Sequence, residues 1–301
     1  MIFEYAVDPA LFSNFNDCRI IFDNFSQEQG RLIAGSPKNW KRQVLENIKK
    51  GEIQPVRKKS IKNKLQKLLK EYVINNRNLS SWDAESSWLE NIAKENNIIP
   101  YAAVLTEQKQ LNPIESYEAS SLFLDAPECW NEHTQISVVR KAKDIVDVIE
   151  PLLLLSQNIV IIDRYFKVGE SQSDNVLKEI IKRANKYCFG KGINKITIHV
   201  SDYRDIQRSL RDDSFQECLP IGFKVLIYSW PDSIIWHDRF LITDVAGFEF
   251  GHGLSEMRPG LPVSHTDSYV DIRTLSFELK KEKLLRFNNR ENATFTAEIE
   301  N

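Results

Sequence analysis

The chain has 301 residues, of which 42% are hydrophobic and 27% charged, and its net charge is −2. This composition is typical of a globular protein with a core, and it excludes a disordered or fibrous chain. The longest apolar stretch, which begins at Pro151, is too short to span a bilayer, and the N-terminus lacks the basic start and apolar core of a signal peptide.

The four cysteines are widely separated, and none has a histidine at metal-ligand spacing. We therefore expect free thiols in a cytoplasmic protein, with neither a metal site nor a cofactor.

Residues 1–130 are predicted to form a separate α+β domain whose family no motif identifies. Strands are expected at three short segments rich in apolar and β-branched residues, 2–7, 19–23 and 101–105. Helices are expected where capping residues precede apolar residues at helical spacing, at 40–50, 60–75 and 86–96.

The segment 41–70 of this domain is strongly basic, with eleven Lys or Arg residues against only two Glu. One interpretation is a solvated helix face. The other is a surface that contacts nucleic acid or an acidic partner, since no Glu alternates with the basic residues before Glu71. The candidate nucleic-acid-binding residues are Lys58, Lys59, Lys62 and Lys64.

The periodicity breaks at 126–134, and a second domain is predicted for 136–290, followed by a polar tail at 291–301. Helices are expected at 136–156, 175–189 and 203–218. Strands are expected at 159–163, 195–200, 223–228, 234–243, 247–250 and 269–272. This alternation predicts an α/β fold with a mixed, mostly parallel sheet flanked by helices.

The segment IIWHDRFLITD contains His237, Arg239 and Asp244, which form the pattern H-x-R-x4-D. On a strand, residues at i and i+2 face the same way, so His237 and Arg239 are expected to point at one anion. The pattern resembles the H-x-K-x4-D motif of the phospholipase D superfamily. That resemblance implies a His that attacks phosphorus, a basic residue that holds phosphate oxygens, and an Asp that supports the geometry.

The order of IVIIDRYF, WHDRFLITDVAGFEFGHGLSE and SYVDI along 159–272 is more particular. It resembles the phospholipase-D-like C-terminal domain of MIT-domain proteins, which bind ESCRT-type filaments, over about 136–290. No MIT helical hairpin is present, so those partners are not implied.

The candidate ligand-binding residues are Asp163, Arg164, Tyr165, Asp238 and His252. Asp163, Arg164 and Tyr165 lie at a strand end, where open α/β sheets bind ligands, or they are a satisfied polar strand end. His252 lies between two glycines, from where it could reach the same crevice, or it is a loop histidine with no role in binding.

Several features depart from active members of the superfamily. The chain has one His motif where two are needed, Arg239 replaces the Lys, and Gly251-His-Gly-Leu replaces the usual Gly-Ser turn. A degenerate site is therefore expected. An alternative is that Arg239 forms a buried ion pair with Asp238 or Asp244 that only ties strands together.

The resulting hypothesis is an accessory or sensor protein that binds a phosphate-bearing ligand, nucleic acid before lipid, or a partner protein. A multi-component microbial system such as antiphage defence is a setting in which such a protein would work. The alternative is a metal-independent phosphodiesterase or nuclease that is active as a homodimer through His237. Whether the protein is an enzyme stays open at this stage.

Overall fold

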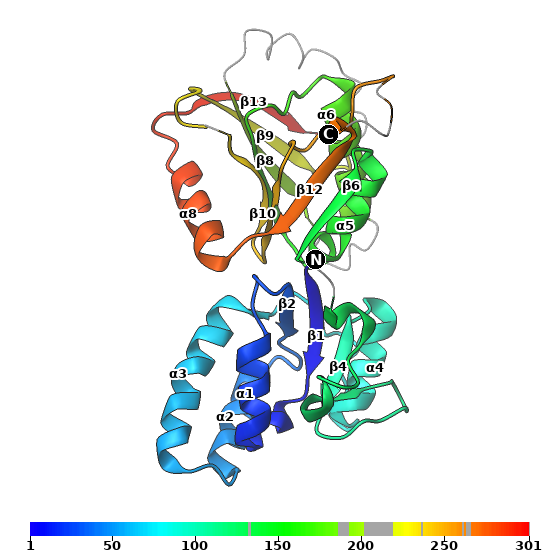
Figure 1. The fold of residues 1–301 in the computed structure, drawn as a ribbon, viewed down its shortest axis with the longest axis vertical. Coiled ribbons are helices and arrows are strands. Elements are labelled where there is room, and N and C mark those ends of the chain that lie inside the picture. The colour runs from blue at the N-terminus through cyan, green and yellow to red at the C-terminus, as the bar shows by residue number, and fades with distance from the viewer. Residues whose placement is uncertain are drawn as a thin grey trace. The chain divides into compact units, whose positions relative to one another are not determined.

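The computed structural model describes residues 1–131, 134–185, 193–201, 219–235, 237–260, 262 and 266–300. The chain divides into two compact units after residue 133 (Figure 1). Both units contain helices and β-strands, so the prediction of an α/β protein is confirmed. The helix expected at 203–218 lies outside the described residues. Within them, no helix is both long and apolar enough to cross a membrane.

The N-terminal unit contains an all-parallel sheet with the strand order β3-β2-β1-β4-β5. Its strands are β1 (Phe3–Val7), β2 (Arg31–Ala34), β3 (Val73–Ile74), β4 (Ala103–Thr106) and β5 (Tyr117–Glu118). The order reverses between β1 and β4, as in doubly wound α/β folds. The expectation of an α+β domain is therefore wrong for this unit, because its helices connect strands that run in the same direction.

Helices cover both faces of this sheet, with α1, α2 and α3 on one side and α4 on the other (Figure 1). The α-helices are α1 (Phe15–Asn24), α2 (Trp40–Lys50), α3 (Pro55–Glu71) and α4 (Trp88–Ile98). Short 3₁₀ helices are η1 (Pro9–Ser13), η2 (Ala119–Ser121) and η3 (Glu128–Asn131).

Segment 19–23 was expected to be a strand and is part of α1. The Asn14 side chain caps this helix by accepting from the backbone N–H of Asn16, and Cys18 and Ile21 are buried three residues apart. The cap and the helical spacing of the buried residues thus outweigh the β-propensity of the Ile-Ile-Phe run.

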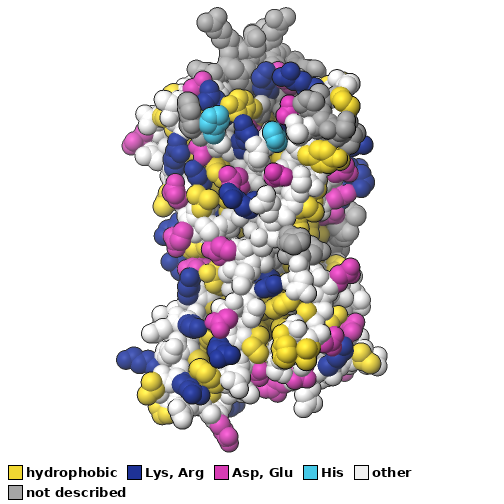
Figure 2. Space-filling model, viewed as in Figure 1, with side chains coloured by type: hydrophobic (Ala, Val, Ile, Leu, Met, Phe, Trp, Pro, Cys, Tyr) yellow, Lys and Arg dark blue, Asp and Glu magenta, His cyan; other side chains and the backbone are white. Residues whose placement is uncertain are grey.

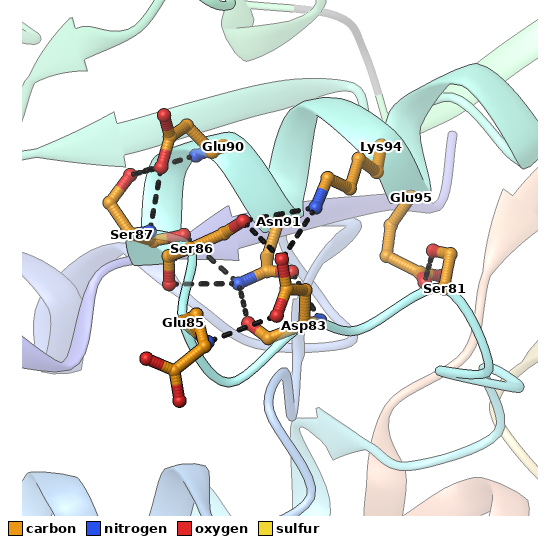
Figure 3. Close-up of polar contacts among 9 residues, drawn as sticks. All are labelled: Ser81, Asp83, Glu85, Ser86, Ser87, Glu90, Asn91, Lys94 and Glu95. Carbon is orange, nitrogen blue, oxygen red and sulfur yellow. Dashed lines mark hydrogen bonds and ion pairs between the residues drawn. The ribbon is translucent and has the colours of Figure 1, made fainter.

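A polar network holds the loop before α4 onto that helix (Figure 3). The side-chain amide of Asn91 donates to the carbonyl oxygens of Asp83, Ser86 and Ser87. Ser87 and Glu90 cap the helix reciprocally. The buried face of α4 packs on the sheet, so these contacts are part of the scaffold.

The C-terminal unit is built on an eight-stranded sheet with the order β13-β9-β8-β7-β10-β11-β12-β6. The strands are β6 (Gln135–Val139), β7 (Asn158–Asp163), β8 (Lys195–Ser201), β9 (Lys224–Trp230), β10 (Arg239–Thr243), β11 (Gly247–Phe250), β12 (Tyr269–Thr274) and β13 (Thr294–Glu300). Only β7, β8 and β9 run parallel to one another, while all other neighbours are antiparallel. The sheet is mixed, as expected, but the prediction that it is mostly parallel is wrong.

Both edges of this sheet differ from the prediction. The start of the expected helix at 136–156 is the edge strand β6, and the expected polar tail forms the other edge strand, β13. β13 pairs antiparallel with β9, and its residues Glu298 and Glu300 form ion pairs with Lys224. β6 (QISVV) is mostly apolar and β13 (TFTAEIE) alternates polar and apolar residues, so both carry a strand pattern that the prediction missed.

Helices flank this sheet on both sides, with α5 and α6 on one side and α8 on the other (Figure 1). They span Ala142–Leu154 (α5), Ser171–Asn185 (α6) and Phe277–Asn288 (α8), and a short 3₁₀ helix, η5, spans Thr266–Ser268. Ile162 of β7 and Phe240 of β10 share a core with Phe287 of α8. This core fixes the ends of β7 and β10, where most candidate site residues lie.

Candidate functional site

The antiparallel pairing of β7 with β10 brings two sequence-predicted segments together. Arg239, the first residue of β10, lies opposite Asp163, the last residue of β7. The backbone N–H of Arg164 donates to the carbonyl of Asp238 over 3.4 Å. The segments 163–165 and 237–239 therefore meet at one end of the sheet.

Asp163 is buried and fixes a turn over this strand end. Its side chain is 1% exposed, and its two oxygens accept from the backbone N–H groups of Tyr165 and Leu254, each over 2.8 Å. Gly253 has a φ of 87°, and a Cβ at that position would lie 2.8 Å from Asp163 Oδ2. Burial raises the pKa of Asp163, opposed by these two N–H groups and by the charges of Arg239 and Arg140. Asp163 is therefore a scaffold residue that positions the turn Gly251–Leu254.

Arg239 is half-buried and donates through Nη1 to the carbonyl oxygen of Gly251. Its Nε is buried and has no hydrogen-bond partner among the described residues. The guanidinium carbon lies 4.8 Å from the centre of the Tyr165 ring. The alternative of an ion pair between Arg239 and Asp238 or Asp244 is wrong, because both carboxylates bond other groups. The positive charge of Arg239 is thus left without a directly bonded carboxylate in the described part of the chain.

Asp238 is 4% exposed and faces α8. Its Oδ1 lies 2.7 Å from the ammonium of Lys283, and its Oδ2 lies 3.3 Å from Nη1 of Arg286. Burial of a carboxylate is tolerated when such cationic partners are present. Asp238 therefore ties the start of β10 to α8 and is not oriented toward a ligand with Arg239.

Asp244 lies beyond the other end of β10, five residues and so roughly 16 Å from Arg239 at strand spacing. Its Oδ1 accepts from the backbone N–H groups of Gln157 and Asn158. Lys280, whose pKa burial lowers to about 8, donates to the backbone carbonyls of Asp244 and Val245. Asp244 therefore stabilises the sheet and does not share a site with His237.

His237 lies just before β10, not on it, so the expectation that His237 and Arg239 are alternate residues of one strand is wrong. It has a φ of 48°, the left-handed region that non-glycine residues rarely adopt. Its exposed ring lies 6.4 Å from the Tyr165 ring, centre to centre. His237 and Arg239 thus both flank Tyr165, although His237 reaches it from a turn.

Tyr165 is the centre of what we call the Tyr165 cluster, which comprises Arg164, Tyr165, His237 and Arg239. The tyrosine side chain is 48% exposed. The guanidinium carbon of Arg164 lies 5.5 Å from its ring centre, and Arg164 also pairs with Asp232 over 2.9 Å. The cluster combines an exposed aromatic ring with two guanidinium groups and an imidazole, and such a combination suits an anion attached to an aromatic group.

Two further arginines were not predicted: Arg140, whose charge acts on Arg239, and Arg258, whose charge acts on Arg140. Arg140, which follows β6, donates to the backbone and the side chain of Ser255. Desolvation lowers the pKa of Arg140. The charges of Asp267 and Asp163 raise this pKa, and the charges of Arg239 and Arg258 lower it. Three arginines and two carboxylates are therefore electrostatically coupled through Arg140, and nothing in the spacing of residues 140, 239 and 258 signals this.

The exposed described histidines are His237 and His252, whereas His199 is buried. Figure 2 shows histidine side chains on one face of the C-terminal unit, among Lys and Arg side chains. His252 belongs to the same turn, Gly251–Leu254, that Asp163 and Arg239 hold.

The basic residues of α3 have several different environments. The ammonium of Lys58 donates to the backbone carbonyl of Lys49 over 2.8 Å, and Lys64 pairs with Asp23 over 3.4 Å. Lys59 and Lys62 are exposed and have no carboxylate within 4 Å among the described residues. Two of the four predicted lysines are thus open for an external ligand.

The strand order of the N-terminal unit reverses where the carboxyl ends of β1 and β4 meet, a common place for ligands. Asp8 and Glu107 follow these strands, and Asp17 lies in the first turn of α1. Burial raises the pKa of Asp8 and of Asp17, and the charge of Glu107 raises both further. This acidic position disfavours phosphate. Among the residues that the structure describes, no group of three or more His, Cys, Asp or Glu could hold a metal ion.

No protein-family model matches the chain, and no curated protein is significantly similar to it.

Proposed function

We propose that the C-terminal unit binds a phosphate-bearing ligand at the Tyr165 cluster without catalysis, and that nucleic acid is the leading candidate for this ligand. The observation that carries the proposal is the environment of Arg239. Its guanidinium lies over an exposed ring, and both acidic residues of the motif, Asp238 and Asp244, bond other groups. A guanidinium group presents paired N–H donors that fit a phosphate.

The like-charged surroundings support the same ligand class. Arg140 adds positive charge near Arg239, and Arg258 adds positive charge near Arg140. Asp163, one of the two carboxylates that offset the charge of Arg140, is buried and already accepts two backbone hydrogen bonds. An external anion would offset this local repulsion.

The test is binding of a fluorescently labelled 20-nucleotide DNA in EDTA, with Arg239→Ala as the variant. Removal of one phosphate contact should weaken binding and make its salt dependence shallower by about one unit of the log–log slope. Arg273→Ala is the control, because Arg273 pairs with Glu249 and lies outside the cluster. Equal binding by wild type and Arg239→Ala would refute the proposal.

One observation favours the second candidate function, a metal-independent nuclease. The ring of His237 is exposed beside Arg239, so two copies of the chain could present their histidines to one phosphodiester. In that case the same DNA should be cleaved in EDTA, and His237→Ala should abolish the cleavage. Binding without cleavage is the result expected from the leading proposal.

A further inference from the structure

Tyr165 is exposed although its backbone is held firmly on both sides. Its N–H is bound by the buried carboxylate of Asp163, and the next residue, Phe166, is 1% exposed and belongs to the core. The N–H of Phe166 also donates to the carbonyl of Asp163 over 3.2 Å. The backbone that carries the ring is therefore fixed before any ligand binds. When a ligand stacks on the ring, the protein should lose little further conformational entropy.

Two cationic groups lie over this ring, which keeps about half of its surface exposed. The guanidinium carbons of Arg239 and Arg164 lie 4.8 and 5.5 Å from the ring centre. Aromatic side chains next to Arg are the pairing used for unpaired nucleotides, because the ring stacks on the base and the guanidinium binds the phosphate. In a duplex the faces of the bases are covered by their neighbours, so the ring has no base to stack on.

From this geometry we infer that the Tyr165 cluster selects single-stranded nucleic acid, with an unpaired base stacked on Tyr165 and a phosphate of the same strand bound by Arg239. The inference rests on the proposed function and adds that the base, as well as the phosphate, is recognised. Stacking of this kind tolerates any base, because every base has a π-face. The selection is therefore for strandedness and not for sequence.

The experiment compares three labelled 20-mers at one salt concentration: a single-stranded DNA, the duplex of the same sequence, and a strand in which abasic sites replace the bases. The wild-type protein should bind the single strand at least about tenfold more tightly than the abasic strand and the duplex. Tyr165→Ala should lower affinity for the single strand by about 5- to 150-fold, as expected for loss of one stacked base. The same variant should leave affinity for the abasic strand unchanged.

Tyr165→Phe is the matched variant, because it keeps the ring and loses only the hydroxyl. It should bind the single strand within about threefold of wild type, and both variants should melt like wild type since the side chain is half exposed. Equal wild-type affinity for the abasic and single strands, or equal losses on both in Tyr165→Ala, would overturn the inference. If Arg239→Ala still weakens binding in that case, the proposed function stands. If wild type binds none of the three strands, both fail.

Discussion

Substitution of Gly253 by Ala tests whether Asp163 holds the turn over the site. Gly253 has a φ of 87°, so any L residue there is strained by about 1–2 kcal/mol. The new Cβ would also lie 2.8 Å from Asp163 Oδ2, closer than real contacts allow. Because Asp163 is buried, its carboxylate can move only by losing its hydrogen bond from Leu254, which costs about 1–3 kcal/mol more.

Gly222→Ala is the matched control. Gly222 has a φ of 75° in the same unit, and a Cβ there would meet nothing within 4 Å. It should show the backbone strain alone, so the two variants should differ by about 1–3 kcal/mol in the free energy of unfolding. Urea denaturation followed by tryptophan fluorescence measures this difference.

A double-mutant cycle strengthens the test. In an Asp163→Ala background the contact partner of the new Cβ is gone, so Gly253→Ala should then cost no more than Gly222→Ala. If Gly253→Ala and Gly222→Ala cost the same in the otherwise wild-type protein, Asp163 does not hold the turn as described.

Three further predictions concern residues outside the Tyr165 cluster. Burial lowers the pKa of His199 to about 3, and its Nδ1 accepts from Trp230 Nε1, so only the unfolded chain gains a proton between pH 6.5 and 3. The free energy of unfolding should therefore fall by about 2 kcal/mol from pH 7 to pH 5 through this residue, and urea titrations of His199→Gln should lack that part of the decrease. Burial lowers the pKa of Lys280 to about 8, so the folded protein loses this proton at a lower pH than the unfolded chain. The stability should therefore rise from pH 8 to pH 10.5, and thermal melts of Lys280→Met should not show this rise. Replacing Lys59 and Lys62 by Glu should change the melting temperature by less than about 2 °C, since exposed charges contribute little, and unchanged DNA binding in this variant would exclude the α3 surface as a nucleic-acid contact.

The sequence predicts the interior of the C-terminal unit better than its edges. The apolar runs at 159–163 and 195–200 are central strands with both faces covered, and such strands are recognisable from composition alone. β6 and β13 lie at the edges, where each pairs with one neighbour. The apolar residues of β6 lead directly into the apolar helix α5, and the alternating pattern of β13 lies in a charged segment, so the strands were missed although each has a strand pattern.

The candidate site was found in part because its residues cluster in three short segments of the sequence. Asp163 lies opposite Arg239 because β7 and β10 pair antiparallel, and that pairing was not predicted from the sequence. The partners of Asp238 lie on α8, some 45 residues later, and Arg140, just after β6, bonds Ser255, 115 residues later in the chain. No local pattern encodes such long-range contacts, so the division between ligand-facing and structural residues required the structure.

The central claim is that Arg239 is part of an anion-binding site, and thermal melting with and without sulfate tests this claim most directly. Sulfate at about 100 times its dissociation constant should stabilise the folded wild-type protein by roughly 2.7 kcal/mol. Arg239→Ala should lose this response. Its free energy of unfolding should fall by only about 1–2 kcal/mol, for the lost hydrogen bond to Gly251. Because sulfate also stabilises proteins non-specifically, the difference between the two proteins is the measured quantity. An equal sulfate response in wild type and Arg239→Ala would contradict the account.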